Sequence, residues 1–175
     1  MADDGFGFGL QNQAVIARLN EIARRYADMS PAMKAIGETV TESTKARFET
    51  STAPDGTPWA PNAVSTVLER ISQIKGAYRK DGRLSKKGAE AYVSKKPLVD
   101  TGITQDSFRW QLAEGGNAVE VGTNRFASEW EGGAAVFHYG RRDGSMPARP
   151  ILGISPADEV DVLDILAHFC EVSLG

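Results

Sequence analysis

The residues that most often bind metals or act as nucleophiles are scarce in this sequence. It contains two histidines and one cysteine, and no spacing groups the His, Cys and carboxylate ligands that a zinc site needs. His168 and Cys170 are two positions apart, so on a helix they would point in different directions. No serine occupies a Gly-x-Ser-x-Gly nucleophile elbow beside a histidine base. The residue types therefore predict neither a metal site nor a serine hydrolase, and we expect no cofactor.

One short segment does match a catalytic motif. Residues 98–102 follow the apolar-apolar-Asp-Thr-Gly signature of aspartic proteases, in which two aspartates share one proton. The chain holds one copy, so a homodimer similar to the retroviral proteases would be required. Those proteases are almost entirely β, and Ile103 stands where they have a small residue. The other interpretation is that Asp100 caps a turn, with Thr101 and Gly102 shaping the entry to the next element.

Positive charge gathers in a basic insert over about 75–97. It holds eight lysines and arginines, Lys86 and Lys87 among them, against two acidic residues, and three glycines interrupt it. Because apolar residues are scarce there, we expect a mobile, exposed segment rather than a core element. Three interpretations stay open, namely a solvated loop, docking onto an acidic protein ring, and contact with nucleic-acid phosphates.

Three arginines near the C-terminal third are further candidates for interaction. Arg141 and Arg142 form a second basic spot in a predicted loop over 140–145. Arg149 lies between Pro147-Ala148 and Pro150, and this rigid frame holds a long bidentate donor in one place. A structural salt bridge and an intersubunit contact are both open for Arg149.

The first nine residues form an arm in which glycine and phenylalanine alternate. So much glycine does not hold a fixed shape alone, and two phenylalanines are unusual in a solvated tail. We expect the arm to be flexible and to use Phe6 and Phe8, either by folding back on the core or by docking onto a neighbour.

Apolar spacing in the first half of the chain predicts three helices. From Leu10 to Tyr26 apolar residues recur every three or four positions, which indicates a helix with one buried stripe. Ser30-Pro31 is typical of an N-cap followed by proline, and a second helix should run from there to about Thr50. Trp59 lies between prolines in a turn-rich segment and should clamp that loop against the core. A third helix is predicted over 64–74.

The apolar period changes to two after the basic insert. Alternation over 108–112 and 119–121, on either side of a glycine turn, predicts a β-hairpin with one buried face. Residues 134–139 are predicted to form another strand, in which His138 is packed or faces solvent.

A last helix should begin at Ser155, where a cap, a proline and an acidic residue follow one another. Its predicted buried stripe consists of Val160, Leu163, Leu166, Ala167 and Cys170. The order of helices, strands and helix argues for an α+β fold with N-terminal helices, a small antiparallel sheet with a hairpin, and a C-terminal helix packed on the sheet. We expect a single structural domain over 1–175.

Size and composition set limits on function. The chain has 175 residues, enough for one domain with a core, and a net charge of −3, too small to attract nucleic acid or a membrane by charge alone. One cysteine fits a reducing compartment. No apolar run approaches the roughly 18 residues of a membrane span, and the acidic N-terminus does not resemble a signal peptide. We therefore expect a soluble protein of the cytoplasm that leaves the cell only inside a larger particle.

Seven short blocks occur in series along the chain. They lie at 47–48, 55–59, 96–102, 119–123, 126–127, 132–133 and 146–153. Trp59, Thr101, Gly102 and Gly153 are the candidate structural residues within them. In this order and spacing the chain resembles the phage virion morphogenesis family, the tail-completion proteins of Mu-like and P2-like tailed bacteriophages. The resemblance runs from about residue 10 to the C-terminus, although Trp130-Glu131 stand where the family often has His-Gln.

The resemblance implies a structural, non-enzymatic protein of the phage neck or tail end. Such a protein completes or caps the tail and helps to join it to the DNA-filled head, without a cofactor. The implied partners are other phage neck and tail proteins and further copies of the chain in a ring, with possible incidental DNA contact and no membrane. The implied location is the host bacterial cytoplasm during assembly and then the virion. The alternative functions are a nucleic-acid-binding accessory protein and the dimeric aspartic protease.

Overall fold

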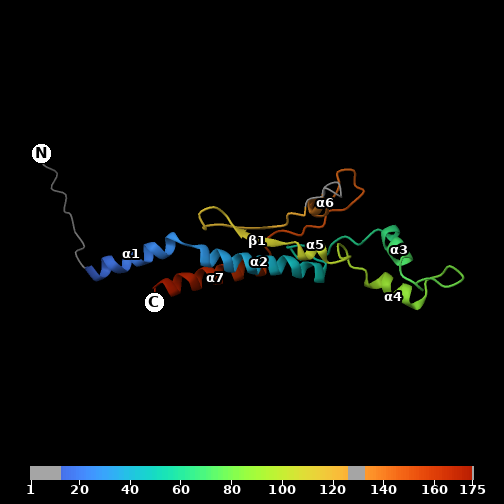
Figure 1. The fold of residues 1–175 in the computed structure, drawn as a ribbon, viewed down its shortest axis with the longest axis horizontal. Helices are drawn as coiled ribbons and strands as arrows, with labels where there is room; N and C mark the ends of the chain where they lie inside the picture. Colours follow the sequence, from blue (N-terminus) through green and yellow to red (C-terminus); the bar gives the residue numbers. More distant parts are fainter. Residues whose placement is uncertain (1–12, 126–132, 175) are drawn as a thin grey trace.

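The computed structural model describes residues 13–125 and 133–174, which form an elongated molecule (Figure 1). Helix α2 (Ser30–Thr50) runs along its middle and contacts both α7 (Pro156–Leu174) and a two-stranded hairpin. Helix α1 (Gln13–Ala27) projects from one end. Helices with one small antiparallel sheet confirm the α+β class.

The two N-terminal helices are found where they were predicted, with one error at a helix start. Ser30 is not the N-cap of α2, because it is already the first helical residue and Met29 precedes it as the cap. The carboxylate of Asp28 accepts the Ser30 N–H at 3.0 Å, and the Met29 carbonyl accepts the Met33 N–H at 3.0 Å. The helix therefore begins one residue earlier than the Ser-Pro pair predicts.

The predicted buried stripe of α1 is wrong for the single chain. Four of its five large apolar side chains, Val15, Ile16, Leu19 and Tyr26, are exposed, Leu19 by 54%, whereas Ile22 is partly buried. The spacing does make one apolar face, as predicted, but α1 extends beyond most of the molecule, so few of the described residues lie near enough to cover it (Figure 1).

The hairpin packs on α2 through a glycine. Strand β1 (Arg109–Leu112) pairs antiparallel with β2 (Val119–Gly122), which confirms the predicted hairpin. Trp110 lies opposite Val121, so apolar side chains share one face. A Cβ on Gly37 of α2 would lie 2.8 Å from ring atoms of Trp110, so this close approach requires glycine.

The main core lies where the end of α2 meets the loops that follow it. Phe48, Ala53, Trp59, Phe108 and Ile151 form one buried cluster. The Phe48 ring meets the Trp59 ring edge-on, with centroids 5.3 Å apart, and lies 5.9 Å from the Phe108 ring. Phe108 directly precedes β1, so this cluster joins α2, the hairpin and the segment before α7.

The basic insert contains a helix that its sequence did not predict. Helix α4 (Lys86–Ser94) lies within it and packs on α3 (Val64–Ser72), at the end of the molecule opposite α1 (Figure 1). A second apolar cluster of Val67, Ile71 and Ala77 holds the two helices together, separate from the main core. The insert therefore stays outside the main core, as expected, and its mobility stays a prediction.

The strand predicted over 134–139 is wrong. Helix α6 (Gly133–Tyr139) occupies this position, and Gly140, at φ 74°, follows it. A short apolar run fits a strand and a helix equally well, and tertiary packing decides between them. The following loop over 140–145 is found as predicted.

Helix α7 begins as predicted but turns a different face inward. Val160, Leu163 and Ala167 of the predicted buried stripe are exposed, whereas Leu166 and Cys170 are partly buried. The helix is apolar on more than one side, so spacing alone could not identify the face that packs on α2.

Candidate functional site

A network of buried polar groups holds the segment 146–153 against α2. The Arg47 guanidinium is buried, where Nη1 donates to the carbonyl of Ile151 at 2.8 Å and Nη2 donates to Asp158 Oδ2 at 2.6 Å. Asp158 also accepts the Ser155 N–H at 2.8 Å, and the Ser155 hydroxyl accepts the Asp158 N–H at 3.1 Å. The Asp158 carboxylate thus caps α7 and neutralises a cation from α2 at the same time.

Burial is the largest single influence on the pKa of both groups in this pair. It lowers the pKa of Arg47, against the opposing effect of the Asp158 charge. Burial raises the pKa of Asp158, but hydrogen bonds from Ser43 and Ser155 and the charge of Arg47 together hold that pKa below its usual value. Asp158 is therefore ionised at neutral pH, and Arg47 stays charged because a guanidinium is not deprotonated in proteins.

The sequence predicted the cap of α7 but missed its partner. Arg47 is 111 positions from Asp158, and no local pattern connects them. The one available signal is that Arg47 falls on the apolar face of α2, where a charged side chain needs a buried partner.

Trp59 clamps its loop to the same segment, as predicted. Its ring is buried in the main core and its Nε1–H donates to the carbonyl of Pro150 at 2.8 Å. Gly153 adopts φ 149°, and a Cβ there would lie 2.8 Å from Cγ of Pro54. The turn around Trp59 therefore fits the segment only because residue 153 is glycine.

Arg149 lies inside the molecule, only 5% exposed. Its Nε donates to the carbonyl of Ala60 at 2.8 Å and its Nη2 to the carbonyl of Pro61 at 2.9 Å. Burial lowers the pKa of this guanidinium. Its described partners are carbonyls rather than a carboxylate, so the geometry supports a structural role, although the salt bridge itself is not found.

His138 also belongs to this network rather than to a strand. From α6, its Nδ1 accepts the backbone N–H groups of Ile151 at 3.0 Å and of Leu152 at 3.3 Å. Burial lowers the pKa of the imidazole. An accepting Nδ1 requires the neutral ring, with its proton on Nε2. Nothing in the sequence pattern around His138 indicated this contact.

Asp100 sits in a surface ion cluster. One oxygen lies 2.5 Å from Nη2 of Arg70 and the other 2.8 Å from Nζ of Lys95. The Lys95 hydrogen bond is the main cause that lowers the pKa of Asp100. Thr101 is exposed, and Gly102, at φ 78°, is the N-cap of the short helix α5 (Ile103–Asp106). This arrangement agrees with the turn interpretation, since a catalytic aspartate pair shares a proton between adjacent carboxylates.

The other candidate interaction residues do not gather in one place. Arg141 and Arg142 are exposed in the loop after α6, whereas Lys86 and Lys87 are exposed at the start of α4. Phe6 and Phe8 lie outside the described residues.

The described residues form no metal-binding cluster but leave several large apolar side chains exposed. Within 13–125 and 133–174, no three His, Cys, Asp or Glu side chains are placed to hold a metal ion. None of the helices in the described part has the length and apolar character needed to cross a membrane. Among the described residues, exposed large apolar side chains are most frequent on α1, and α3, α4 and α7 each carry two, with Val93 of α4 86% exposed. Exposed apolar surface of this kind is typical of sites that bind other proteins.

Comparison with known families identifies the chain. It matches the phage virion morphogenesis family over residues 10–170, which is most of its length. No curated protein and no solved structure gave a match. The chain therefore belongs to the phage virion morphogenesis family, a family of phage structural and morphogenesis proteins rather than enzymes.

Proposed function

We propose that this protein is a structural component of the phage neck or tail end, where it completes or caps the tail and helps to join it to the head. The family match over residues 10–170 carries this proposal. It implies partners in the virion, which we propose to be other neck and tail proteins and further copies of this chain.

The placement of the sequence blocks supports a binding role. Arg47, Phe48, Trp59, Arg149 and Ile151 come from three of the blocks that define the resemblance, and all are buried together or hydrogen-bonded into one framework. These residues stabilise the scaffold. The exposed faces of α1, α7 and the α3–α4 end are left to contact partners.

The decisive experiment is electron microscopy of particles made by a phage or prophage that lacks the gene. We expect filled heads lying apart from tails, because the joining step would fail, and abnormal tail length if capping is the main role. A plasmid copy of the gene should restore joined, infectious particles. Normal particles without the gene would contradict the proposal.

The same complementation separates the protease alternative from the structural one. Asp100→Asn removes the carboxylate that a dimeric aspartic protease would need, yet changes only an exposed ion cluster. We expect full restoration of infectivity by this variant, and failure would favour catalysis at Asp100.

A second candidate function is contact with DNA through the α3–α4 end. Seven of the eight cations in the basic insert are exposed there, including Lys80 and Arg83. If they bind DNA phosphates, affinity should fall steeply as salt rises, and Lys80→Glu with Arg83→Glu should reduce that slope. Binding that ignores both changes would reject this candidate.

A further inference from the structure

We propose that α1 of one copy packs on the outer face of α7 of a second copy, so that identical chains join head to tail. This inference rests on the proposed function, because it names the contact that would build the ring expected at the tail end.

Helix α1 presents an apolar face that the described residues leave largely exposed. Ile16 is 42% exposed and Leu19 is 54% exposed, on the half of α1 farthest from the rest of the molecule. A helix of 15 residues is marginal by itself in water, so packing of that face would stabilise it.

The chain's own α7 cannot supply that packing. The two helices meet at the base of α1, where the Tyr26 hydroxyl and Cys170 interact. Leu19 lies seven residues before Tyr26, and Leu163 seven residues before Cys170, which is about 10 Å along each helix. The two helices run in opposite directions (Figure 1). Leu19 and Leu163 therefore lie on opposite sides of the contact between Tyr26 and Cys170, away from each other. A contact between the two apolar faces is therefore intermolecular.

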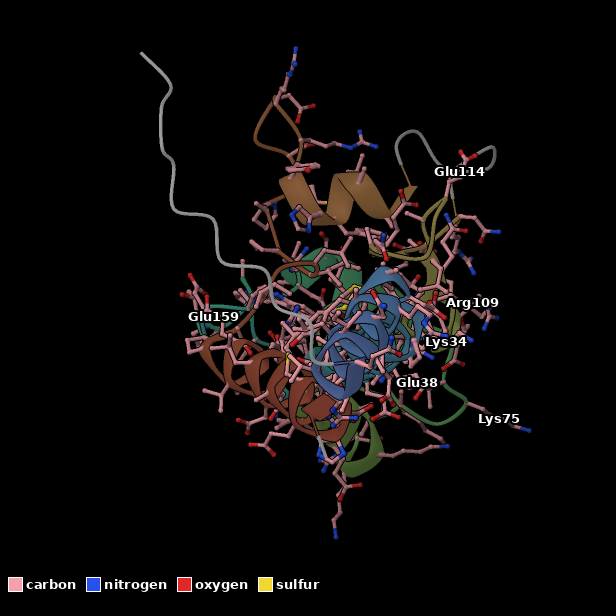
Figure 2. The ribbon with its side chains drawn as sticks, turned by 90° about the vertical axis from the view of Figure 1, so that its left-hand side faces the viewer. Lys34, Glu38, Lys75, Arg109, Glu114 and Glu159 are labelled. Carbon is pink, nitrogen blue, oxygen red and sulfur yellow. The ribbon has the colours of Figure 1, made fainter. Side chains whose placement is uncertain are left out.

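The outer face of α7 has the matching apolar pattern. Val160 and Leu163 are 57% and 64% exposed, and Ala167 extends the same face by one turn. In the view down the long axis, Glu159 of α7 lies on the side of the molecule opposite Lys34 and Glu38 of α2 (Figure 2). The exposure of Val160, Leu163 and Ala167 shows that α2 does not cover this face.

The charges of the two helices are complementary, which is why a second copy is the occupant we favour. The sequence of α1 contains three arginines and one glutamate, whereas α7 contains five acidic residues and no lysine or arginine. Asp158 is buried with Arg47, but Glu159, Asp161, Asp164 and Glu171 are exposed. An acidic, apolar α7 face attracts a basic, apolar α1 and disfavours another α7.

This contact joins two different surfaces, so it is a heterologous interface. Repeated from copy to copy, such an interface closes into a ring when the rotation between copies permits it. The elongated shape places α1 at one extreme of the molecule, from which it can reach a neighbour without hindrance from its own core (Figure 1).

Cysteine cross-linking of the full-length protein tests the interface directly. On a Cys170→Ala background, chains with Leu19→Cys and chains with Leu163→Cys carry different tags and are mixed before oxidation. We expect a disulfide between the two tagged chains. As a matched control, Val93→Cys replaces Leu19→Cys, because Val93 is even more exposed but lies on α4. We expect that control pair to lose the cross-link.

Sedimentation of uncross-linked protein gives the second readout. Leu19→Ser and Leu163→Ser should each weaken self-association about tenfold or more, whereas Val93→Ser should leave it unchanged. High salt should also weaken it, because the charge pairs are screened. A protein that stays monomeric, or equal cross-linking of the control pair, would overturn the inference and mean that residues 1–12 or another phage protein covers α1.

The two proposals can fail separately. Loss of the cross-link in a chain that still restores joined particles would reject this interface and leave the tail role standing. A specific cross-link, together with normal particles from a phage that lacks the gene, would support this interface and reject the tail role.

Discussion

A buried charge is tolerated in this molecule where it has several partners. Arg47 has the Ile151 carbonyl, the Ser43 hydroxyl and the Asp158 carboxylate, while Arg149 has two carbonyls. Removing one group leaves its buried partners without a hydrogen bond or a countercharge. That loss costs more free energy of unfolding than the intact group of contacts contributes. The residues most sensitive to change should therefore be these polar ones.

Arg47→Met should lower the free energy of unfolding by about 3–5 kcal/mol, because it leaves the Asp158 carboxylate buried without its cation. Urea denaturation of the two proteins measures the difference. Arg70→Met is the matched control, since Arg70 pairs with Asp100 on the surface, and it should cost at most about 1 kcal/mol. Equal losses in the two variants would show that the Arg47 pair is not a structural anchor.

His138 should make stability depend on pH. Burial holds its folded pKa below the usual 6.5, so on acidification the unfolded chain takes up the proton first. Stability should therefore fall as the pH drops below about 6.5, and level off once the folded chain is protonated too.

His138→Asn should remove that pH dependence, since asparagine can place an acceptor near the same N–H groups but does not titrate. His168→Asn, on the exposed side of α7, is the control and should keep the slope. Thermal melts between pH 5 and 8 compare the three proteins. If the His138→Asn variant keeps the slope of stability against pH, other titrating groups must cause it.

At the scale of elements, α2 is the helix on which the others are placed. It contacts α7, α5 and both strands of the hairpin, and two kinds of residue make this possible. Gly37 lets the hairpin approach closely, and Arg47 ties α2 to the start of α7.

Gly37→Ala should destabilise the protein by about 1–3 kcal/mol, because the added Cβ would overlap the Trp110 ring and Val119. Helix propensity alone predicts the opposite sign, since alanine is better than glycine in a helix by about 1 kcal/mol. The sign of the measured change therefore decides between packing and propensity. Glu38→Ala, exposed on the next position, should change stability by no more than about 0.5 kcal/mol.

At the scale of the whole molecule, the main core and the α3–α4 end should differ in their free energy of local opening. The main core joins α2, the hairpin and the segment before α7, whereas the α3–α4 end has its own small cluster of Val67, Ile71 and Ala77. Fewer apolar contacts mean a lower free energy of local opening. The α3–α4 end should therefore open more readily than the rest.

Gly88→Ala tests this independence. Its Cβ would collide with the carbonyl oxygen of Ala77, so α4 should no longer seat on α3. Hydrogen exchange should become faster over 64–94 and stay unchanged in α2 and α7. Glu90→Ala, exposed on the same helix, should leave the exchange pattern as it is. Loss of protection throughout the chain would mean that the two clusters unfold together.

Local pattern and local chemistry were sufficient to predict several elements and the family. Spacing of three or four predicted α2 and α3, period two predicted the hairpin, and the Ser155 cap predicted the start of α7. Trp59 between prolines was rightly expected to hold its loop on the core. The series of blocks also indicated the family, which the match over 10–170 confirms.

Tertiary structure alone decided which apolar faces are buried and which distant polar groups meet. The run at 134–139 became α6 because a short apolar segment has no preference that outweighs its packing. The burial of α1 and the inward face of α7 were predicted wrongly, since an apolar stripe specifies that something covers it, without specifying what. The Arg47–Asp158 pair and the His138 contacts join residues far apart in the chain, and such contacts leave no periodic trace in the sequence.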